Sequence, residues 1–97
     1  NPFHGIHAAV TRQDKGNQPE NGWIPEQAIT IEEAMRSFTI DAAWAAHQEN
    51  DLGGLSPGKW ADFILIDQDL FTIPSQDLWK TEVLQTWLAG KQVYKKP

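Results

Sequence analysis

The amino-acid sequence predicts an α+β fold in which short helices come first and strands follow. Apolar residues recur at helical spacing in residues 30–38 and 40–48. The second half instead contains three runs with strand character, at residues 61–67, 82–89 and 92–95, and the last two flank a tight turn. A chain of 97 residues is expected to hold one small domain.

The N-terminal third is predicted to be mostly loop. Residues 1–12 predict a loop followed by a short helix, because Pro2 and Gly5 interrupt the start of the segment. Residues 13–29 predict an irregular loop, since glycine, asparagine and proline recur along it. A loop seldom exposes a tryptophan without a packing reason, so Trp23 is expected to anchor this loop.

The first confident helix is predicted at residues 30–38. Its apolar residues fall at i, i+3, i+4 and i+7 and form one stripe: Ile31, Ala34, Met35 and Phe38. Thr30 stands at the N-cap position and Glu33 follows three residues later, which is the spacing of a capping box. The start of this helix is therefore marked by sequence, and its apolar stripe is expected to face a core.

A second helix is predicted to follow at residues 40–48, with Thr39 as its cap. Trp44 and His47 lie on its apolar stripe, so we expect His47 to be a packed histidine rather than a ligand. The other positions are rich in alanine, which lets neighbours approach closely. Asparagine, aspartate and then Gly53 with its glycine neighbour are expected to end the helix.

The strands are predicted from turns and from alternation. Residues 56–59 have proline and then glycine at their centre, which predicts a type II turn. Residues 61–67 are apolar on both faces, which predicts a central strand. A loop should follow, and residues 82–89 and 92–95 should pair around Gly90-Lys91 as a type II′ turn. Residues 82–89 also match a helical stripe, so a helix there stays open.

Composition excludes several classes of protein. A formal net charge of −5 argues against non-specific nucleic-acid binding, which needs a basic face. No cysteine is present, which excludes disulfide scaffolds and cysteine-ligated metals. No apolar run reaches the roughly 18 residues of a membrane span, and no segment resembles a signal peptide. Membrane association is therefore not expected. The absence of cysteine fits either redox compartment, so the compartment stays open, with the cytoplasm favoured over the periplasm.

A phosphate-binding loop is suggested by residues 53–59, which match GxxxxGK, and we reject it. Trp60 follows the lysine, where magnesium binding needs serine or threonine. Pro57 removes one backbone N–H from the loop that would hold phosphate. The predicted order is also reversed, since a phosphate-binding loop leads from a strand to a helix.

Histidine spacing is the remaining chemical signal. His4 and His7 are spaced H-x-x-H and would share a face if both lay on one helix. The nearest third ligands, Asp14 and Glu20, both fall in the predicted loop. We therefore expect one histidine in the loop and the other on the surface of the short helix or packed against it. No nucleophile, base and oxyanion donor are assembled, so no catalytic residue and no metal ligand is predicted in these residues.

Several segments together resemble one family. Residues 54–67, GLSPGKWADFILID, resemble the G-x-L-x-P-G-K-x-A-D-hydrophobic-D segment near the C-terminus of metal-dependent amidohydrolases. Other segments are similar to the amidohydrolase family 3 branch, which includes N-substituted formamide deformylases and YtcJ-like proteins. They are residues 1–13, 23–30 and 83–94. Residues 30–34 and 39–43 resemble the two short helices that precede the first segment in metal-dependent amidohydrolases. The resemblance covers essentially the whole chain, in order.

This resemblance implies a fold larger than the chain. The family fold is a (β/α)8 barrel with a small composite β-sandwich built from both ends of the polypeptide, and such a barrel needs about 250 residues. It implies that residues 1–50 supply the last helices of the barrel and residues 51–97 the C-terminal strands of the sandwich. The first residue is asparagine rather than methionine, so we expect a C-terminal fragment of a longer chain.

The resemblance also implies what the site would contain. The family hydrolyses non-peptide carbon–nitrogen bonds in small amide-type substrates with water activated by a divalent metal, and zinc is the expected ion. The family's metal ligands would all lie before Asn1, so none is assigned here and the chain alone is expected to be inactive. Residues 1–4 would follow the eighth barrel strand, at the face where substrates bind. Phe3 and His4 are accordingly the candidates for a substrate-pocket rim.

Two hypotheses about the function of the whole chain remain open. In one, the chain is part of an amidohydrolase and its partner is the missing N-terminal part of the same polypeptide. In the other, it is a free-standing α+β module that binds a partner protein without catalysis. Ten aromatic residues are too many for so small a fold to bury. Both readings therefore predict an exposed apolar patch, covered by missing chain or by another copy in a homo-oligomer.

Overall fold

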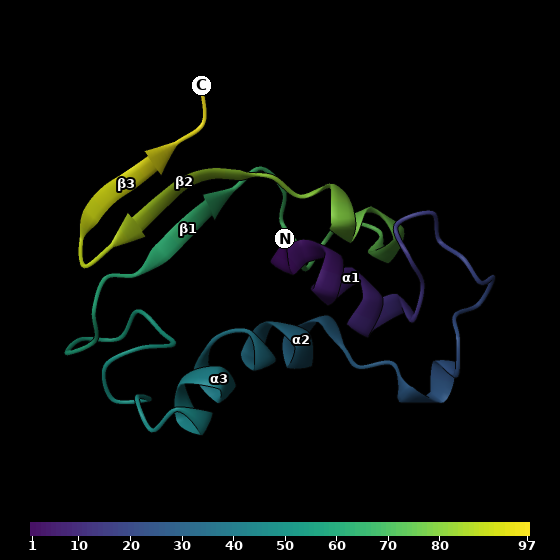
Figure 1. Cartoon of the computed structure of the whole chain (residues 1–97), viewed down its shortest axis with the longest axis horizontal. Helices are drawn as coiled ribbons and strands as arrows, with labels where there is room; N and C mark the ends of the chain where they lie inside the picture. The colour runs from purple at the N-terminus through teal and green to yellow at the C-terminus, as the bar shows by residue number, and fades with distance from the viewer. The chain divides into compact units, whose positions relative to one another are not determined.

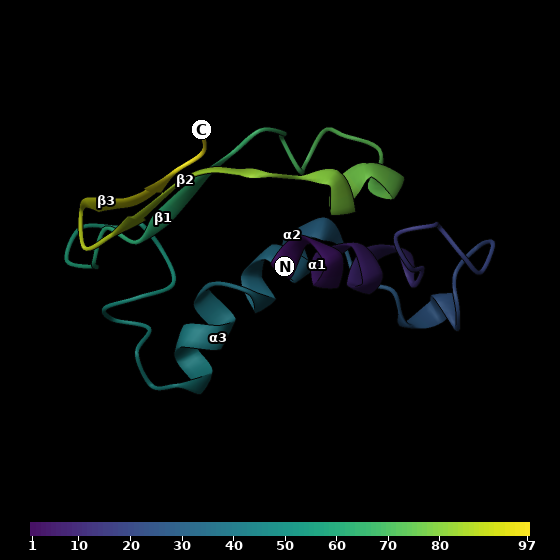
Figure 2. The same cartoon turned by 45° about the horizontal axis from the view of Figure 1, so that its top comes forward.

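The computed structural model describes all 97 residues and has helices first and a three-stranded sheet last. The order is α1 (Pro2–Thr11), η1 (Pro25–Gln27), α2 (Ile31–Ser37), α3 (Ile40–Ala45), β1 (Phe63–Ile66), η2 (Ser75–Lys80), β2 (Val83–Leu88) and β3 (Lys91–Lys95), where η marks a 3-10 helix (Figures 1 and 2). The predicted α+β class is present, with two short helices that were not predicted. η1 lies in residues 13–29, for which an irregular loop was predicted, and η2 lies between the predicted strands.

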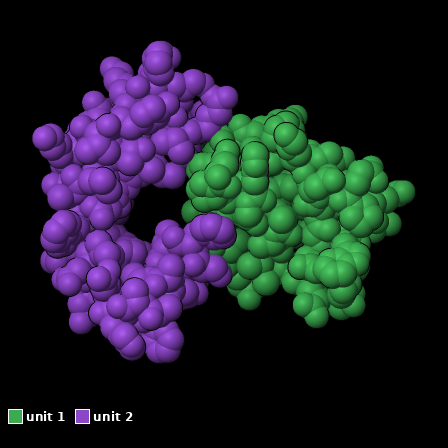
Figure 3. All heavy atoms as spheres, in the orientation of Figure 1, with its two compact units in different colours: residues 1–35, 68–81 green, residues 36–67, 82–97 purple.

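The chain divides into two compact units (Figure 3). Residues 1–35 and 68–81 form the first unit, and residues 36–67 and 82–97 form the second. The division within this chain does not follow the predicted boundary at residue 50, because the segment that carries η2 returns to the first unit. The boundary at residue 50 refers to the complete enzyme and stays a prediction.

Helix α1 begins earlier than predicted. Asn1 is the N-cap, and its side-chain Oδ1 accepts a hydrogen bond of 2.9 Å from the backbone N–H of Phe3. Pro2 occupies the first helical position, where its missing N–H costs nothing and its fixed φ suits the helix. Pro2 and Gly5 therefore do not make residues 1–5 a loop. Proline at the first position starts a helix instead of breaking one.

The core of the first unit lies between α1 and η2, which pack together. The buried side chains there come from both segments: Phe3, Ile6 and His7 on α1, and Leu70 and Leu78 from the segment 68–81. Ala34 on α2 is fully buried as well. The apolar residues that stood in an unassigned region of the sequence thus supply one side of this core.

The loop after α1 is closed by residues at its two ends. Arg12 has left-handed backbone dihedrals and ends α1. Its carbonyl accepts from the Trp23 N–H at 2.9 Å, and its side-chain Nε donates to the Trp23 carbonyl at 2.8 Å. The guanidinium carbon lies 5.1 Å from the centre of the Trp23 ring. Trp23 anchors the loop as predicted, but through Arg12 at the surface, since its side chain is 63% exposed.

Helix α2 begins with the predicted capping box. The Thr30 hydroxyl accepts from the Glu33 N–H at 3.1 Å, and a Glu33 carboxylate oxygen accepts from the Thr30 N–H at 3.0 Å. The helix ends at Ser37, one residue before the predicted end. The reciprocal bonds confirm that the start of this helix is encoded locally.

Helix α3 ends earlier than predicted, at Ala45. His47 takes a φ of 59°, its N–H bonds the Trp44 carbonyl at 3.0 Å, and the Gln48 N–H bonds the Ala43 carbonyl at 2.8 Å. These two bonds form a Schellman motif, which satisfies the last carbonyls of the helix. The prediction of a packed His47 is wrong, because this residue is the exposed left-handed cap and not part of the apolar stripe.

The sheet has the strand order β1-β2-β3, with both pairs antiparallel. The predicted strand at 82–89 is therefore confirmed, and its helical alternative is wrong. The prediction that the strand at 61–67 is central is also wrong within this chain: β1 is an edge strand and β2 is central. That prediction was based on the apolar residues on both faces of the strand. Both faces of β1 are partly exposed in this chain, since Ile64 is 43% exposed and Leu65 is 45% exposed.

The hairpin turn lies one residue earlier than predicted. Leu88 pairs with Lys91, so Ala89 and Gly90 are the two central residues. Both have positive φ, 51° and 77° respectively, which makes the turn type I′ and not type II′. Type I′ matches the right-handed twist of the flanking strands, and this match outweighs the cost of positive φ at an alanine.

Two further turn predictions can be compared with the structure. The Lys59 N–H bonds the Ser56 carbonyl at 3.2 Å and Gly58 has a φ of 94°, which confirms the turn at 56–59 and argues against a phosphate loop. Gly53 does not end α3. A Cβ there would lie 2.8 Å from the Ile40 Cα, so this glycine lets the chain pass close to the start of α3.

Candidate functional site

The candidate residues Phe3 and His4 both lie in the first turns of α1. Phe3 points into the core of the first unit and is 4% exposed. His4 is on the exposed side of the same helix, and its ring stands edge-on to the Trp79 ring with centroids 6.4 Å apart. Their proposed place at a pocket rim stays a prediction. The structure adds Trp79 as a neighbour of His4.

His7 has a different environment from His4, although both are on α1. It is 1% exposed, and its Nε2 lies 3.0 Å from the Asp14 carbonyl oxygen. A carbonyl only accepts, so Nε2 carries the hydrogen in this contact. The other ring nitrogen, Nδ1, is buried and makes no hydrogen bond. His7 is thus the packed histidine of the pair, and it ties α1 to the loop that follows.

These two histidines do not fit a metal site. The Nε2 atom of His7 is hydrogen-bonded to the Asp14 backbone carbonyl, and its Nδ1 atom is buried in the first unit. No group of three or more histidine, aspartate or glutamate side chains is placed to hold a metal among residues 1–97. Asp14, one of the two conceivable third ligands, instead turns its carboxylate to the N–H groups of Gly16 and Gln18, at 2.8 and 3.2 Å.

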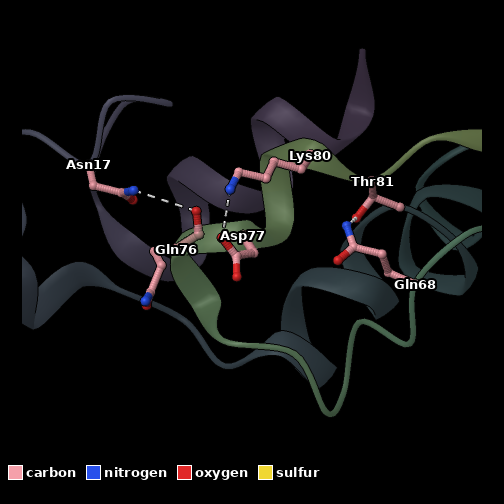
Figure 4. A network of polar contacts seen from close by, with 6 residues as sticks. All are labelled: Asn17, Gln68, Gln76, Asp77, Lys80 and Thr81. Atoms are coloured by element: carbon pink, nitrogen blue, oxygen red, sulfur yellow. Dashed lines mark hydrogen bonds and ion pairs between the residues drawn. The ribbon is translucent and has the colours of Figure 1, made fainter.

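A set of polar contacts surrounds η2 in the first unit (Figure 4). The Asn17 side-chain amide donates to the Gln76 carbonyl at 3.5 Å, and Lys80 pairs with Asp77 at 3.2 Å. The Gln68 side chain donates to the Thr81 hydroxyl at 3.2 Å, and Thr81 is itself buried. These contacts are spread along η2 rather than converging on one point, so they hold the segment and do not form a catalytic set.

Two aspartates of the A-D-hydrophobic-D segment have structural roles in the second unit. The Asp62 carboxylate accepts from the Ala89 N–H at 2.8 Å, before β1. The Asp67 carboxylate accepts from the Glu82 N–H at 2.9 Å, after β1. Each therefore fastens one end of β1 to β2. Their positions on either side of the apolar run at residues 63–66 are the sequence signal for this role.

The capping box of α2 perturbs the pKa of Glu33. The hydrogen bond from the Thr30 backbone N–H, followed by the Thr30 side chain, lowers the pKa of the Glu33 carboxyl from its ordinary value of 4.5. Glu33 lies at the surface at a helix start, where a negative charge is favoured. This lowered pKa belongs to a helix cap rather than to a general acid.

No helix here is long and apolar enough to cross a membrane; the longest, α1, has 10 residues.

Trp79 and Thr81 were not singled out from the sequence. The available signal was Pro74-Ser75 followed three residues later by the apolar Leu78, which is compatible with a short helix after a proline.

Comparison with known proteins gives a consistent result. A sequence model described as "Amidohydrolase family" matches residues 1–94. The chain is 39% identical over 94 residues to "Protein LONG AFTER FAR-RED 3" of Arabidopsis thaliana, covering 97% of this chain and 16% of that protein. It is 28% identical over 95 residues to "N-substituted formamide deformylase" of Arthrobacter pascens, covering 98% of this chain and 17% of that protein.

A solved structure shares the fold. The crystal structure of an amidohydrolase from Thermotoga maritima MSB8 superposes with a TM-score of 0.61 at 21% identity, over 74% of this chain and 17% of that one. At this identity the likeness concerns the fold alone. The chain spans about a sixth of the length of the curated relatives named above.

Proposed function

Because the chain belongs to the amidohydrolase family, we propose that it is the C-terminal part of a hydrolase that cleaves non-peptide, amide-type carbon–nitrogen bonds. In such a reaction water adds its oxygen to the acyl carbon, and the nitrogen leaves with a proton. The match to the family over residues 1–94 carries the proposal. The relative named as an N-substituted formamide deformylase supports N-substituted formamides as the first substrates to test.

We further propose how the chain is divided in the complete enzyme. Residues 1–50 form the last helices of a (β/α)8 barrel, and residues 51–97 form the C-terminal part of a small β-sandwich. The helical first half and the strand-rich second half support this division. The proposal places Phe3 and His4 at the rim of the substrate pocket, since they open the first helix of the chain.

The metal of the complete enzyme, zinc by expectation, is held by residues outside these 97 in this proposal, and it supplies activated water. The histidines of α1 do not fit a metal site, because the Nε2 atom of His7 is hydrogen-bonded to the Asp14 carbonyl. We propose instead that the chain contributes packing. Asp62 and Asp67 fasten β1 to β2, and Asn1 fixes the start of α1.

The test uses the complete polypeptide that contains these residues. It should release amine from N-substituted formamides and contain a stoichiometric divalent metal by elemental analysis. Changing His7 to Gln should leave the metal content unchanged, and changing His4 to Ala should alter KM more than kcat. A metal-free polypeptide without hydrolytic activity on any amide probe would overturn the proposal.

One observation favours a second candidate, the interaction module without catalysis. Large apolar side chains are exposed on this chain, among them Trp44 at 68% and Trp60 at 59%. Such a surface is typical of an interface. If the same polypeptide is inactive and a separate protein covers Trp44 and Trp60, the interaction module is the correct reading.

A further inference from the structure

We infer that Asn21 is a site of covalent modification by deamidation, and that the contacts between Arg12 and Trp23 control how fast it reacts. The inference goes beyond the proposed hydrolase function and does not depend on it. It is drawn from the loop that follows α1, which lies within the first unit. The reactants are this loop and water.

The chemistry follows from asparagine standing directly before glycine, as Asn21 and Gly22 do. The Gly22 backbone nitrogen forms a bond to the Asn21 Cγ, the Cγ–Nδ2 bond breaks, and the Gly22 proton leaves with that nitrogen as ammonia. Water then opens the resulting succinimide at one of its two carbonyls. The product is aspartate, or isoaspartate in which the backbone runs through Cβ and Cγ. Water enters, ammonia leaves, and nothing is oxidised or reduced.

Asn21 is the reactive asparagine of this chain. Glycine favours the ring closure because it has no side chain to hinder the approach of its nitrogen. The other three asparagines precede larger residues: Asn1 precedes proline, Asn17 precedes glutamine and Asn50 precedes aspartate. Asn21 is also exposed, so water reaches its side chain. Asn50 is equally exposed but lacks the glycine, which makes it an internal reference.

The fold requires one half of this reactive pair and favours the other. Gly22 has a φ of 86°, and a Cβ there would lie 2.6 Å from the Thr11 carbonyl oxygen, so no other residue fits. Asn21 has a φ of 64° at the third position of the turn 19–22. A positive φ at that position is typical of a type II turn, which takes glycine or asparagine there. The local backbone therefore selects the reactive dipeptide.

The closed loop also protects this dipeptide. The Gly22 N–H donates to the Pro19 carbonyl at 2.9 Å, and this bond must break before the nitrogen can lose its proton and attack. The next residue is held on both sides: the Trp23 N–H donates to the Arg12 carbonyl at 2.9 Å, and the Arg12 Nε donates to the Trp23 carbonyl at 2.8 Å. The turn is therefore free to rearrange only when the Arg12–Trp23 contacts release.

The isoaspartate product would keep the loop open. It adds one backbone atom immediately before Gly22, which already lies against the Thr11 carbonyl. The lengthened chain cannot keep both the turn at 19–22 and the Arg12–Trp23 contacts. The aspartate product has the same charge and an unchanged backbone, and aspartate tolerates positive φ. Only the isoaspartate form should therefore disturb the loop.

The first test compares the complete polypeptide, folded and in urea, at mildly alkaline pH. Peptide mass spectrometry measures conversion of Asn21, and isoaspartate-specific methylation measures the rearranged product. We expect conversion to be at least about tenfold slower in the folded protein, because the loop must open first. Asn50 should react slowly in both samples. Equal rates at Asn21 in the two samples, or no conversion in urea, would overturn the inference.

A matched pair of variants tests the Arg12–Trp23 contacts. Arg12→Lys keeps the positive charge but removes the Nε donor and the guanidinium that lies 5.1 Å from the centre of the Trp23 ring. It should speed conversion in the folded protein by about fivefold. Arg36→Lys makes the same exchange in the second unit, at an exposed pair with Asp41, and should leave the rate unchanged. Equal folded-state rates in the two variants would contradict the role of these contacts.

A measurement on the unsubstituted protein does not depend on whether Arg12→Lys folds. Hydrogen exchange at the Gly22 amide gives the fraction of time for which the turn is open. That fraction multiplied by the rate in urea should match the folded-state rate at Asn21 within about threefold. A much faster folded-state rate would mean that the closed turn reacts, and the inference would be wrong.

The separated products test the effect on the loop. In the isoaspartate form the Gly22 and Trp23 amides should exchange about tenfold faster than in the unmodified protein. Asn21→Asp carries the same added charge on an unchanged backbone, and these amides should exchange in it as in the unmodified protein. Similar exchange in both forms would exclude the lengthened backbone as the cause. Hydrolytic activity is not a readout in any of these measurements, so they stand or fall separately from the proposed function.

Discussion

Thr30 and Glu33 show how much a pair of residues can encode at the start of a helix. Their reciprocal hydrogen bonds satisfy two backbone N–H groups that a helix start leaves free. The Thr30 backbone N–H, and then its hydroxyl, stabilise the carboxylate form of Glu33 and lower its pKa below 4.5. The pair therefore predicts a pH dependence as well as a structure.

We predict that stability conferred by Glu33 is present above pH 4.5 and is lost as the pH falls through its lower folded pKa. The sign follows from the folded carboxyl binding its proton more weakly than the unfolded one. Carboxyl chemical shifts in a pH titration should place the Glu33 pKa below its ordinary value of 4.5. Thr30→Ala should move the Glu33 value up, though only in part, because the backbone N–H remains. An unchanged value in Thr30→Ala would contradict the role of the hydroxyl.

His7 and His4 form a matched pair on α1 for a test of burial. His7→Leu keeps most of the buried volume and removes the bond to Asp14, so we expect a loss of about 1–2 kcal/mol in the free energy of unfolding. His4→Leu, on the exposed side, should change it by no more than about 0.5 kcal/mol. Chemical denaturation of the two variants measures both. Nitrogen-15 shifts of His7 should show a hydrogen on Nε2.

At the scale of elements, the ends of α3 and of the hairpin are held by residues with positive φ. His47 closes α3 at 59°, and Ala89 opens the turn at 51°. A residue with a Cβ is strained in this region by about 1–2 kcal/mol. A sequence pattern does not assign positive φ to either residue type. For this reason the predicted end of α3 lies three residues too late, and the predicted hairpin turn lies one residue too late.

The hairpin turn offers a stabilising substitution. Ala89→Asn places Asn-Gly at the centre of a type I′ turn, which is the favoured pair there. We expect a gain of up to about 1 kcal/mol in the free energy of unfolding, since asparagine tolerates positive φ better than alanine. Gly90→Ala is the control and should be destabilising. A loss of stability in Ala89→Asn, measured by thermal unfolding, would indicate that the turn is not type I′.

The approach of the chain to α3 can be tested at a glycine. Gly53 has a φ of 89°, and a Cβ would lie 2.9 Å from the Ala43 Cβ. Gly53→Ala should therefore destabilise the protein by about 1–3 kcal/mol through strain and overpacking. Gly58→Ala also has positive φ but meets nothing within 4 Å, so it isolates the backbone cost. Denaturant midpoints that are equal for the two variants would exclude a packing contribution at Gly53.

At the scale of the whole molecule, the chain exposes more apolar surface than its own residues can cover. Trp23, Trp44 and Trp60 are each more than half exposed, at 63%, 68% and 59%. The chain belongs to the amidohydrolase family and spans about a sixth of the length of the curated relatives named above. In the proposed complete enzyme, the rest of the polypeptide would cover these tryptophans. This is a consequence of the proposed function that stability measurements can examine.

We predict that Trp44→Ala and Trp60→Ala behave as core substitutions in the complete polypeptide. Each should then cost about 3–5 kcal/mol, the usual range for a buried tryptophan. Residues that stay exposed would instead change the free energy of unfolding by about 0.5 kcal/mol or less. Glu26→Gln, an exposed change in η1, is the control. Small effects for both tryptophans would mean that this surface stays open to solvent.

The sequence by itself determined the features that short-range chemistry encodes. The capping box of Thr30 and Glu33, the type II turn at 56–59 and the alternation of the strands depend on neighbours in the chain, so they were predicted without coordinates. Family membership was likewise predicted from ordered motifs, and the comparisons confirm it. The absence of an apolar run long enough to span a membrane also follows from the sequence alone.

The tertiary structure decided what depends on residues distant in sequence. His7 is buried because the core of the first unit surrounds it, and that core includes Leu70 and Leu78 from the distant segment 68–81. β1 is an edge strand because only β2 pairs with it here, although its apolar faces suit an interior position. Periodicity reports which residues avoid water, and only the packed chain shows what covers them.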